Sequence, residues 1–404
     1  MTLRDQAITA ATRVLARVFP HQASGRLDPP PRRILVLKPC CLGDLLMATA
    51  TLHALREAYP DAVIHLAVGA ASQAAVLGNP RLGAIVPLGS VGSSHTSARA
   101  YLTVARQLRA GRYDTAFTLD RSPLLGLLPW LAGISRRVGL DSGGRGLAHT
   151  VRVAAPPAAP RHEAEVYLDT LRAVGLAPVA PRLEFFPSQT DEAEVEELRI
   201  KVEGLGITTP TSVVRPLSFV LLHPAGGVNP GMTLLAKRWP AERFAQLADR
   251  LADDMGMQVV LVGGPGDREV SAEVVRHARR PLLDLTGQLG WGALGALARH
   301  AALYIGNDTG ATHLAVAVGA PTIMLMGPTD PRRYGPYRPT APDTVAYVVP
   351  PDARPDDYLA LRAAARLQAD SPLSIQRVSV DQVYAAAQRL LTQSVPESQH
   401  ASPR

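Results

Sequence analysis

Short apolar runs alternate with helix-like segments through most of the chain, and this alternation restricts the fold to the α/β class. In the first half, strand-like runs are expected at 34–37, 63–68, 84–88 and 115–119, and helices at 45–59 and 97–110. Strands that alternate with helices build βαβ units, whose strands run parallel and are buried on both faces. The first half is therefore predicted to form a doubly wound parallel sheet.

The same alternation begins again after residue 216. Strand-like runs are expected at 219–222, 259–262, 282–285, 303–305 and 322–326, and helices at 241–255, 267–279, 291–301 and 310–318. A chain of 404 residues is also too long for one hydrophobic core of ordinary size. We therefore expect two Rossmann-like doubly wound parallel-sheet domains that face each other across a cleft, where strand ends and helix N-termini converge.

Pro-rich and Thr-rich segments suggest where the domains begin and end. The segment 208–216 is the expected linker between them. The predicted organisation is an N-terminal amphipathic helix with a Pro-rich segment at 1–30, domains at 31–215 and 216–375, a C-terminal helix at 376–392 and a disordered tail at 393–404.

The charge and the cysteines limit the partners and the compartment. A formal net charge of +7 and a pI near 9.7 favour a polyanionic partner. The chain has six Phe and no cluster of aromatic and basic residues, so a phosphate-bearing small molecule or a lipid is expected rather than nucleic acid. Cys40 and Cys41 are adjacent and cannot adopt ordinary disulfide geometry, which predicts a cytoplasmic location. No apolar run reaches the about 18 residues of a membrane span.

Residues 4–19 place apolar side chains among three arginines, a pattern typical of a short basic amphipathic helix. Such a helix could lie on the anionic surface of the inner membrane, which would make the protein peripheral on its cytoplasmic face. It could equally cover the core of the protein's own domain, as amphipathic helices usually do. Both alternatives stay open at this point.

Asp44 is the candidate catalytic residue. The sequence 38–44 joins the first predicted strand to the first predicted helix, which places Asp44 at the helix start, facing the cleft. A carboxylate at such a place can act as a general base that takes the proton of an attacking hydroxyl group. The alternative is that Asp44 merely caps the helix, since Asp is a preferred N-cap residue.

A second motif occupies residues 304–313, where a strand end is followed by small residues that open a helix. Backbone N–H groups and the dipole at a helix start can hold a diphosphate and stabilise the charge on a leaving nucleotide. The hydroxyls of Thr309 and Thr312 could donate further hydrogen bonds. In the alternative interpretation Asp308 caps the helix and His313 only packs in its first turn.

The loop after the predicted strand 219–222 contains Gly226 and leads to Lys237 and Trp239. Lys237 could neutralise a phosphate, although a surface lysine is the commoner case. Trp239 is expected to pack in the core rather than to form a platform for a sugar. The first strand is not followed by the Gly-x-Gly-x-x-Gly fingerprint, and no Walker-type phosphate loop occurs, so these two kinds of nucleotide site are not favoured.

Taken together, the motifs resemble those of the ADP-heptose lipopolysaccharide heptosyltransferases of glycosyltransferase family 9. The segments that carry the resemblance occur in the family's order and are 42–44, 237–240, 307–310, 313–315, 327–331 and 335–336. The similarity extends from about Arg32 to Leu391 and includes the segments 113–120 and 137–139.

The resemblance implies a GT-B fold whose N-terminal half binds the acceptor and whose C-terminal half binds the nucleotide-sugar donor. It also implies an inverting transfer that needs no metal and no cofactor, with Asp44 as general base. The donor contacts implied by the match are Lys237, Asp308, Thr309, Gly310 and His313, with Gly226 and Asp267 beside them. Glu269 is the alternative to Asp267 as the carboxylate that holds the ribose.

The acceptor is less well defined, and Gly43, Arg99 and Arg121 are its candidate contacts. Where core heptosyltransferases often carry a dense Arg and Lys cluster, this chain has the uncharged or weakly basic segment 92–97, so the acceptor's identity stays open. Cys40 and Cys41 stand where the family often has small polar residues. We expect them to be buried and to shape the loop rather than to react.

The sequence therefore predicts transfer of a sugar, heptose from ADP-heptose, onto a glycolipid or cell-envelope saccharide. A donor that carries a sugar other than heptose stays open. A nucleotide-sugar epimerase or hydrolase of the same fold is one alternative. A protein that binds a nucleotide sugar without catalysis is another, although the presence of both Asp44 and the diphosphate loop argues against it.

Overall fold

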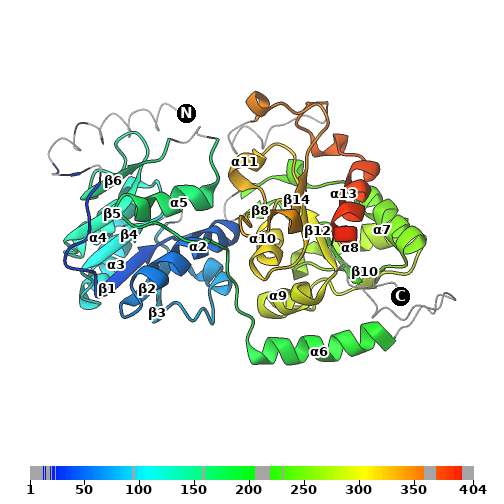
Figure 1. The fold of residues 1–404 in the computed structure, drawn as a ribbon, viewed down its shortest axis with the longest axis horizontal. Coiled ribbons are helices and arrows are strands. Elements are labelled where there is room, and N and C mark those ends of the chain that lie inside the picture. Colours follow the sequence, from blue (N-terminus) through cyan, green and yellow to red (C-terminus); the bar gives the residue numbers. More distant parts are fainter. Residues whose placement is uncertain are drawn as a thin grey trace, which may run out of the picture. The chain divides into compact units, whose positions relative to one another are not determined.

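A computed structural model describes residues 24–92, 96–156, 160–204, 219–229, 232–358 and 370–393, with Thr12, Val14, Phe19, His21 and Gln22. The chain divides into two compact units, Met1–Glu184 and Phe185–Arg404 (Figure 1). Most of the expected N-terminal helix, the expected linker 208–216 and the tail after residue 393 lie outside the described residues.

The first unit is built on a six-stranded parallel sheet in the order β3-β2-β1-β4-β5-β6. Its strands are β1 (Arg33–Leu37), β2 (Val63–Val68), β3 (Ala84–Pro87), β4 (Thr115–Thr118), β5 (Arg136–Asp141) and β6 (Val151–Ala154). β1 pairs in register with β2 on one side and with β4 on the other, so it occupies the centre of the sheet.

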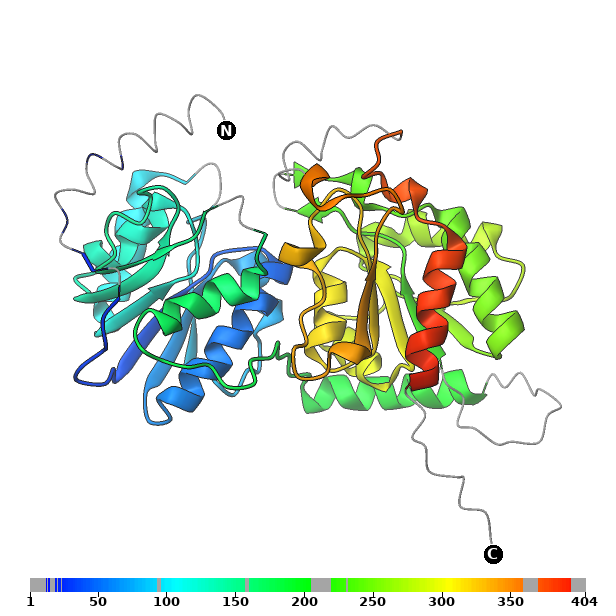
Figure 2. The ribbon, with the colours of Figure 1, turned by 45° about the horizontal axis from the view of Figure 1, so that its top comes forward.

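The helices of the first unit cover both faces of this sheet, as Figure 2 shows. They are α2 (Leu42–Ala58), the short 3-10 helix η1 (Ala70–Ala75), α3 (Ala98–Ala110), α4 (Pro123–Leu131) and α5 (Glu163–Arg172). α2 packs against α5 and η1, and α3 packs against α4. The core between α3, α4 and the sheet contains Leu35 and Leu37 of β1 with Val104 and Leu128 of the helices.

The second unit repeats this arrangement, with a parallel sheet in the order β11-β10-β7-β12-β13-β14. Its strands are β7 (Phe219–His223), β10 (Gln258–Leu261), β11 (Leu283–Asp284), β12 (Leu303–Asn307), β13 (Thr322–Leu325) and β14 (Val345–Val348), and a small hairpin pairs β8 (Val228–Asn229) with β9 (Met232–Thr233). Counted from the start of each unit, both sheets have the strand order 3-2-1-4-5-6 of a Rossmann fold.

The helices of the second unit again flank the sheet (Figure 1). They are α6 (Gln189–Gly204), α7 (Ala241–Met255), α8 (Arg268–His277), α9 (Trp291–His300), α10 (Gly310–Ala317), α11 (Pro331–Tyr334) and α13 (Val380–Gln393), with the 3-10 turns η2 (Leu235–Lys237), η3 (Pro265–Asp267), η4 (Pro342–Thr344), η5 (Pro355–Asp357) and η6 (Ile375–Arg377). Trp239 is buried against Phe244 of α7, with ring centroids 4.9 Å apart, which confirms that it packs in the core.

The prediction of two Rossmann-like parallel-sheet domains is confirmed, and each strand and helix expected within the two domains is present within a few residues. The structural boundary falls after Glu184, earlier than the expected boundary after residue 215. The reason is α6, which packs against α9, and Arg299 Nη1 lies 2.6 Å from Glu192 Oε1. The segment from Phe185 therefore belongs to the second unit.

No helix among the described residues is both long and apolar enough to cross a membrane.

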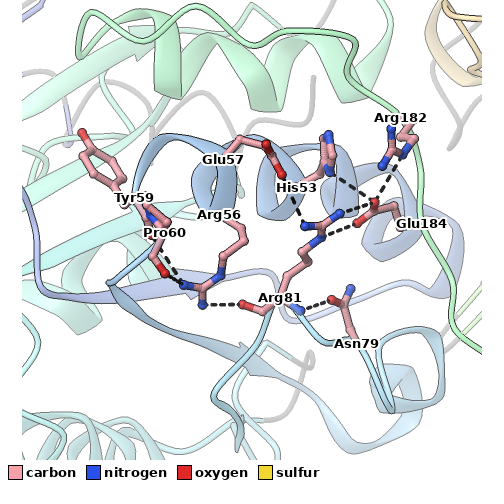
Figure 3. Close-up of polar contacts among 9 residues, drawn as sticks. All are labelled: His53, Arg56, Glu57, Tyr59, Pro60, Asn79, Arg81, Arg182 and Glu184. Carbon is pink, nitrogen blue, oxygen red and sulfur yellow. Dashed lines mark hydrogen bonds and ion pairs between the residues drawn. The ribbon is translucent and has the colours of Figure 1, made fainter.

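A buried carboxylate fixes the end of the first unit. Glu184 is almost fully buried, and Arg81 binds both of its carboxylate oxygens at 3.0 and 3.1 Å (Figure 3). His53 Nδ1 lies 3.1 Å from the same carboxylate, and the Glu184 backbone N–H donates to Thr49 Oγ1 at 2.9 Å. Both His53 and Thr49 belong to α2, so this network ties the last residue of the unit to that helix.

We predict that Arg81→Met lowers the free energy of unfolding by about 3 kcal/mol, because it leaves a buried carboxylate without its main partner. Arg182 is the matched control, since its side chain is half exposed and makes one 3.3 Å bond to Glu184. Arg182→Met should cost less than about 1 kcal/mol. Urea denaturation followed by circular dichroism measures both values, and equal losses would contradict this account.

Candidate active site

The carboxyl ends of the two central strands of the first sheet carry charged side chains. Lys38 directly follows β1, and Asp120 follows β4, the neighbouring strand. The connections from these two strands leave on opposite faces of a doubly wound sheet, and ligands of such folds generally bind at this point. Lys38 Nζ lies 3.4 Å from Asp44 Oδ2 and 3.7 Å from Asp120 Oδ2, so one ammonium joins the two carboxylates.

Asp44 lies in the first turn of α2, and 32% of its side chain is exposed. Residues 41–44 are partly exposed, whereas the following residues up to Leu55 are buried. The helix is capped by Cys41 without a side-chain hydrogen bond, so the alternative in which Asp44 is the N-cap is wrong. A carboxylate in the first turn is favoured by the positive end of the helix dipole.

Lys38 is buried, with 6% of its side chain exposed, and stays charged. Burial lowers the pKa of Lys38, but the carboxylates of Asp44 and Asp120 outweigh it, so the pKa lies well above its usual value. The ammonium lies 5.5 Å from the centre of the Tyr167 ring. Burial and, next, the Asp44 carboxylate raise the pKa of Tyr167, which therefore remains a neutral phenol.

Cys40 and Cys41 are both free and partly exposed, so the expectation of buried thiols is wrong. A hydrogen bond from Cys41 lowers the pKa of Cys40 to about 7, against the opposing effect of burial and with help from the Lys38 ammonium. The hydrogen bond with Cys40 and burial raise the pKa of Cys41. A thiolate is thus available at neutral pH beside the candidate base.

The three candidate acceptor contacts differ in what they already bind. Gly43 is partly exposed in the first turn of α2. Arg99 is exposed in the first turn of α3. Arg121 binds both oxygens of the buried Glu163 at 2.9 and 3.2 Å, so its charge is already compensated within the unit.

The second unit carries its candidate residues at the matching place, where the neighbouring strands β7 and β12 end. Asn307, the last residue of β12, donates from Nδ2 to the carbonyl oxygens of Pro224 and Ala225 at 2.9 and 3.1 Å. The backbone N–H of Trp239 donates to Asn307 Oδ1 at 3.1 Å. The buried side-chain amide of Asn307 therefore joins the loop after β7 to the end of β12, a role that was not predicted from the sequence.

Lys237 and Asp308 form a buried ion pair. Lys237 Nζ lies 2.6 Å from Asp308 Oδ2, and Thr329 Oγ1 donates to the same oxygen at 2.5 Å. Burial raises the pKa of Asp308, but Lys237 and then His313 lower it more, so Asp308 is ionised. Lys237 is therefore not the ordinary surface lysine of the alternative interpretation, and His313 is a buried electrostatic neighbour of Asp308.

The start of α10 offers backbone donors, but one of the two expected hydroxyls is not free to bind a ligand. Thr309, rather than Asp308, is the N-cap, and its side-chain oxygen accepts from the Thr312 N–H. Thr312 is fully buried and donates its hydroxyl to the carbonyl oxygen of Asn307 at 2.6 Å, so the expectation that it donates to a phosphate is wrong. Thr309 and Gly310 are partly exposed.

Gly226 lies against the cap of α10. Its φ of +112° is one that side chains rarely adopt, and a Cβ placed there would collide with Thr309 Cγ2. Arg238 Nε donates to the Gly226 carbonyl oxygen at 2.6 Å. The missing side chain thus allows the loop after β7 to approach the start of α10 closely.

Asp267 lies beside the same strand end. Its Oδ2 accepts from the Gly264 N–H at 2.8 Å and lies 3.6 Å from His223 Nε2. Burial raises the pKa of Asp267, but the contact with His223 and the Gly264 amide lower it more, so the carboxylate is ionised. Thr309 Oγ1 lies 3.4 Å from the other ring nitrogen of His223, which places this histidine between Asp267 and the cap of α10.

The structure thus groups the predicted donor residues Lys237, Asp308, Thr309, Gly310, His313, Gly226 and Asp267 around the ends of β7 and β12 in the second unit. Sequence reasoning gave no role to Lys38, Asp120, His223 or Asn307. All four stand at the end of one of the central strands or within two residues after it, and this position was the available signal. Among the described residues, the side chains close enough to hold a metal ion together are Glu242, Glu273 and His277, on α7 and α8.

Comparison with known proteins identifies the family. Residues 101–346 match the family model described as Glycosyltransferase family 9 (heptosyltransferase). The chain belongs to this family. It is 28% identical over 309 residues to lipopolysaccharide heptosyltransferase 2 of Escherichia coli K12, which covers 74% of this chain and 84% of that protein.

Solved structures agree with the family assignment. The glycosyl transferase family 9 protein from Veillonella parvula is 25% identical with a TM-score of 0.76, and the match covers 92% of this chain and 100% of that one. The ADP-heptose lipopolysaccharide heptosyltransferase II of E. coli is 23% identical with a TM-score of 0.65, covering 89% and 99%, which shows the shared fold. This family 9 member is therefore a glycosyltransferase with a GT-B fold.

The Cys40 environment generates a prediction that does not depend on turnover. The rate of alkylation of Cys40 by iodoacetamide should rise through a midpoint near pH 7 and level off above it, because the thiolate is the nucleophile. Peptide mass spectrometry separates Cys40 from Cys41, which should react more slowly. Cys41→Ala removes the hydrogen bond and should move the midpoint to higher pH. A midpoint near that of a free thiol, about 8.5, in the unaltered protein would contradict this prediction.

Proposed function

We propose that this glycosyltransferase moves heptose from ADP-heptose onto a lipopolysaccharide or related cell-envelope saccharide. Membership of family 9 and the names of the relatives support this substrate class. The partly exposed carboxylate of Asp44, at the start of α2 and beside Lys38, is the observation that carries the proposal.

Asp44 is proposed as the general base of an inverting, single-step transfer. The acceptor oxygen attacks the anomeric carbon of the sugar while its proton passes to the Asp44 carboxylate. The bond from the anomeric carbon to the diphosphate breaks, and ADP leaves with the electron pair. The location of Asp44 in a helix N-terminal turn favours the anionic form that must accept this proton.

The donor diphosphate is proposed to lie at the start of α10. Backbone N–H groups at Gly310 and beyond, together with the helix dipole, would stabilise the charge that develops on ADP, without a metal ion. Lys237 donates one of its three N–H hydrogens to Asp308, and the other two are proposed to bind the phosphates. Asp267 is proposed to hold the donor ribose, and Gly226 gives the loop its close approach to Thr309.

The acceptor is proposed to bind to the first unit, with Gly43 and Arg99 in contact with it. Arg99 is exposed, whereas Arg121 is held by Glu163, so Arg99 is the stronger candidate for an acidic group of the acceptor. We further propose that the protein works in the cytoplasm, at the inner face of the membrane that holds glycolipid acceptors. A membrane contact through the N-terminal segment belongs to this proposal and falls largely on residues outside the described ranges.

Asp44→Asn should lower kcat by about 10²–10⁴, because the variant keeps its shape but has no proton acceptor. The Kd for ADP, measured by calorimetry, should stay unchanged because the proposed donor site lies on the second unit. Asp61→Asn makes the same chemical change at an exposed position of the first unit and is the matched control. Unchanged turnover of Asp44→Asn would refute its role as base.

Product analysis with and without acceptor tests the class of reaction. Sugar should appear on the acceptor and should not be released at a comparable rate when the acceptor is left out. Rapid release of free sugar would favour a hydrolase, and an altered nucleotide sugar would favour an epimerase. Donor binding without turnover across a panel of acceptors would favour a binding protein.

Gly226→Ala tests the donor site. The new methyl group would collide with Thr309 and adopt an unfavourable φ, so the Kd for ADP should rise about tenfold, equivalent to about 1.4 kcal/mol. Gly256→Ala is the matched control, because Gly256 also has a positive φ, of +63°, but a Cβ there meets no atom within 4 Å, and the residue caps the C-terminal end of α7. An equal Kd for ADP in both variants would mean that the contact of Gly226 with Thr309 does not shape the nucleotide site.

A further inference from the structure

Lys38 is a buried cation with two carboxylate partners from different elements. Asp44 comes from α2, and Asp120 follows β4. Asp120 is the more buried of the two, with 19% of its side chain exposed against 32% for Asp44. Its other oxygen accepts from the Ser122 N–H at 2.7 Å, which fixes the carboxylate in place.

The charges of this cluster balance differently before and after a proton arrives. With both carboxylates ionised, the cluster of Lys38, Asp44 and Asp120 carries one net negative charge. When Asp44 takes a proton, Lys38 and Asp120 remain as a neutral pair. If Asp120 were absent, protonation of Asp44 would leave the buried ammonium without a counter-ion, which is strongly unfavourable.

We propose that Lys38 and Asp120 are positioning residues for the transfer, with Lys38 orienting the Asp44 carboxylate and Asp120 serving as the counter-ion of Lys38 while Asp44 holds the acceptor's proton. This inference rests on the proposed role of Asp44 as general base. The proton leaves the acceptor hydroxyl as its oxygen bonds to the anomeric carbon, and ADP departs with the electrons of the broken bond. Lys38 and Asp120 keep their own protonation states throughout.

Other titratable groups face the cluster, and their effects on a pH profile must be distinguished from those of Lys38, Asp44 and Asp120. Lys38 lies over the ring of Tyr167 of α5, a neutral phenol, and Arg121 and Glu163 form a compensated pair near that tyrosine. Burial and the Asp120 carboxylate raise the pKa of Tyr101 of α3, which is a neutral phenol as well. The Cys40 thiol, whose pKa is about 7, and Cys41 precede α2. Cys40 would titrate within the range of an activity profile, so pH profiles are best compared in a Cys40→Ser background as well as in the unaltered chain.

The proposal predicts pH shifts of opposite sign. Removing the cation in Lys38→Met should move the acid limb of the kcat/KM profile to higher pH, by about one pH unit, because the neighbouring carboxylates lose their stabilising charge. Asp120→Asn should move the same limb to lower pH and lower the plateau, because Lys38 then pairs with Asp44 alone and makes it a weaker base. General damage to the fold would not shift the limb in two directions.

Two further variants complete the experiment. Lys38→Arg keeps the charge and should restore the position of the acid limb. Arg136→Met removes a cation of another ion pair of the same unit, with Asp114 at 2.8 Å, and should leave the limb in place. ADP binding and thermal melting identify variants that fail to fold. If Lys38→Met is among them, Asp120→Asn, which keeps the size of the side chain, still tests the predicted downward shift.

The outcomes separate this inference from the proposed function. Full turnover by Asp44→Asn would show that Asp44 is not the general base, and would therefore refute the proposed function of this residue. A second outcome is that Asp44→Asn is inactive while the acid limb of the kcat/KM profile stays at the same pH in both Lys38→Met and Asp120→Asn. This outcome would overturn the positioning role alone. Opposite shifts, with Lys38→Arg close to the unaltered protein, would support it.

Discussion

The reversal of strand order at the centre of each sheet determines where polar side chains can be placed. Connections from two neighbouring central strands leave on opposite faces, so the backbone just beyond their carboxyl ends is not covered by a crossing helix. Lys38 and Asp120 occupy this place in the first unit, and His223 and Asn307 occupy it in the second. The apolar strands position these groups, and helix starts add directed N–H donors beside them.

The two units use buried charge in different ways. Lys237 and Asp308 form a pair that is neutral as a whole, and Thr329 satisfies the same carboxylate. Lys38 instead has two partners, one of them partly exposed, so its surroundings can take up a proton without leaving the cation unpaired. Buried ion pairs contribute little to stability because desolvation offsets their attraction. Their presence at both strand ends is better explained by binding and proton transfer than by stability.

Much of the fold could be predicted because each strand is a short apolar run bounded by turn residues, as in the strand that ends before Lys38. Helix α6 was missed because its surface is mostly polar, and its partner α9 lies far along the chain. The contact of Lys38 with Asp120 joins residues brought together by sheet order alone, which periodicity does not reveal. The partial exposure of Cys40 and the burial of the Thr312 hydroxyl likewise depend on packing rather than on residue type.

The contact of Gly226 with Thr309 has an evolutionary consequence. The threonine methyl group fills the space that any side chain at position 226 would need, while the next nearest atom, Thr309 Cβ, would lie 3.3 Å from the first carbon of such a side chain. A serine at 309 would keep the capping hydroxyl and remove the closest contact, leaving the tight approach to Cβ and the backbone strain at position 226. The two positions are therefore expected to depend on each other in evolution. A relative with a side chain at position 226 should have a smaller residue than threonine at position 309, and the change at 309 should have come first.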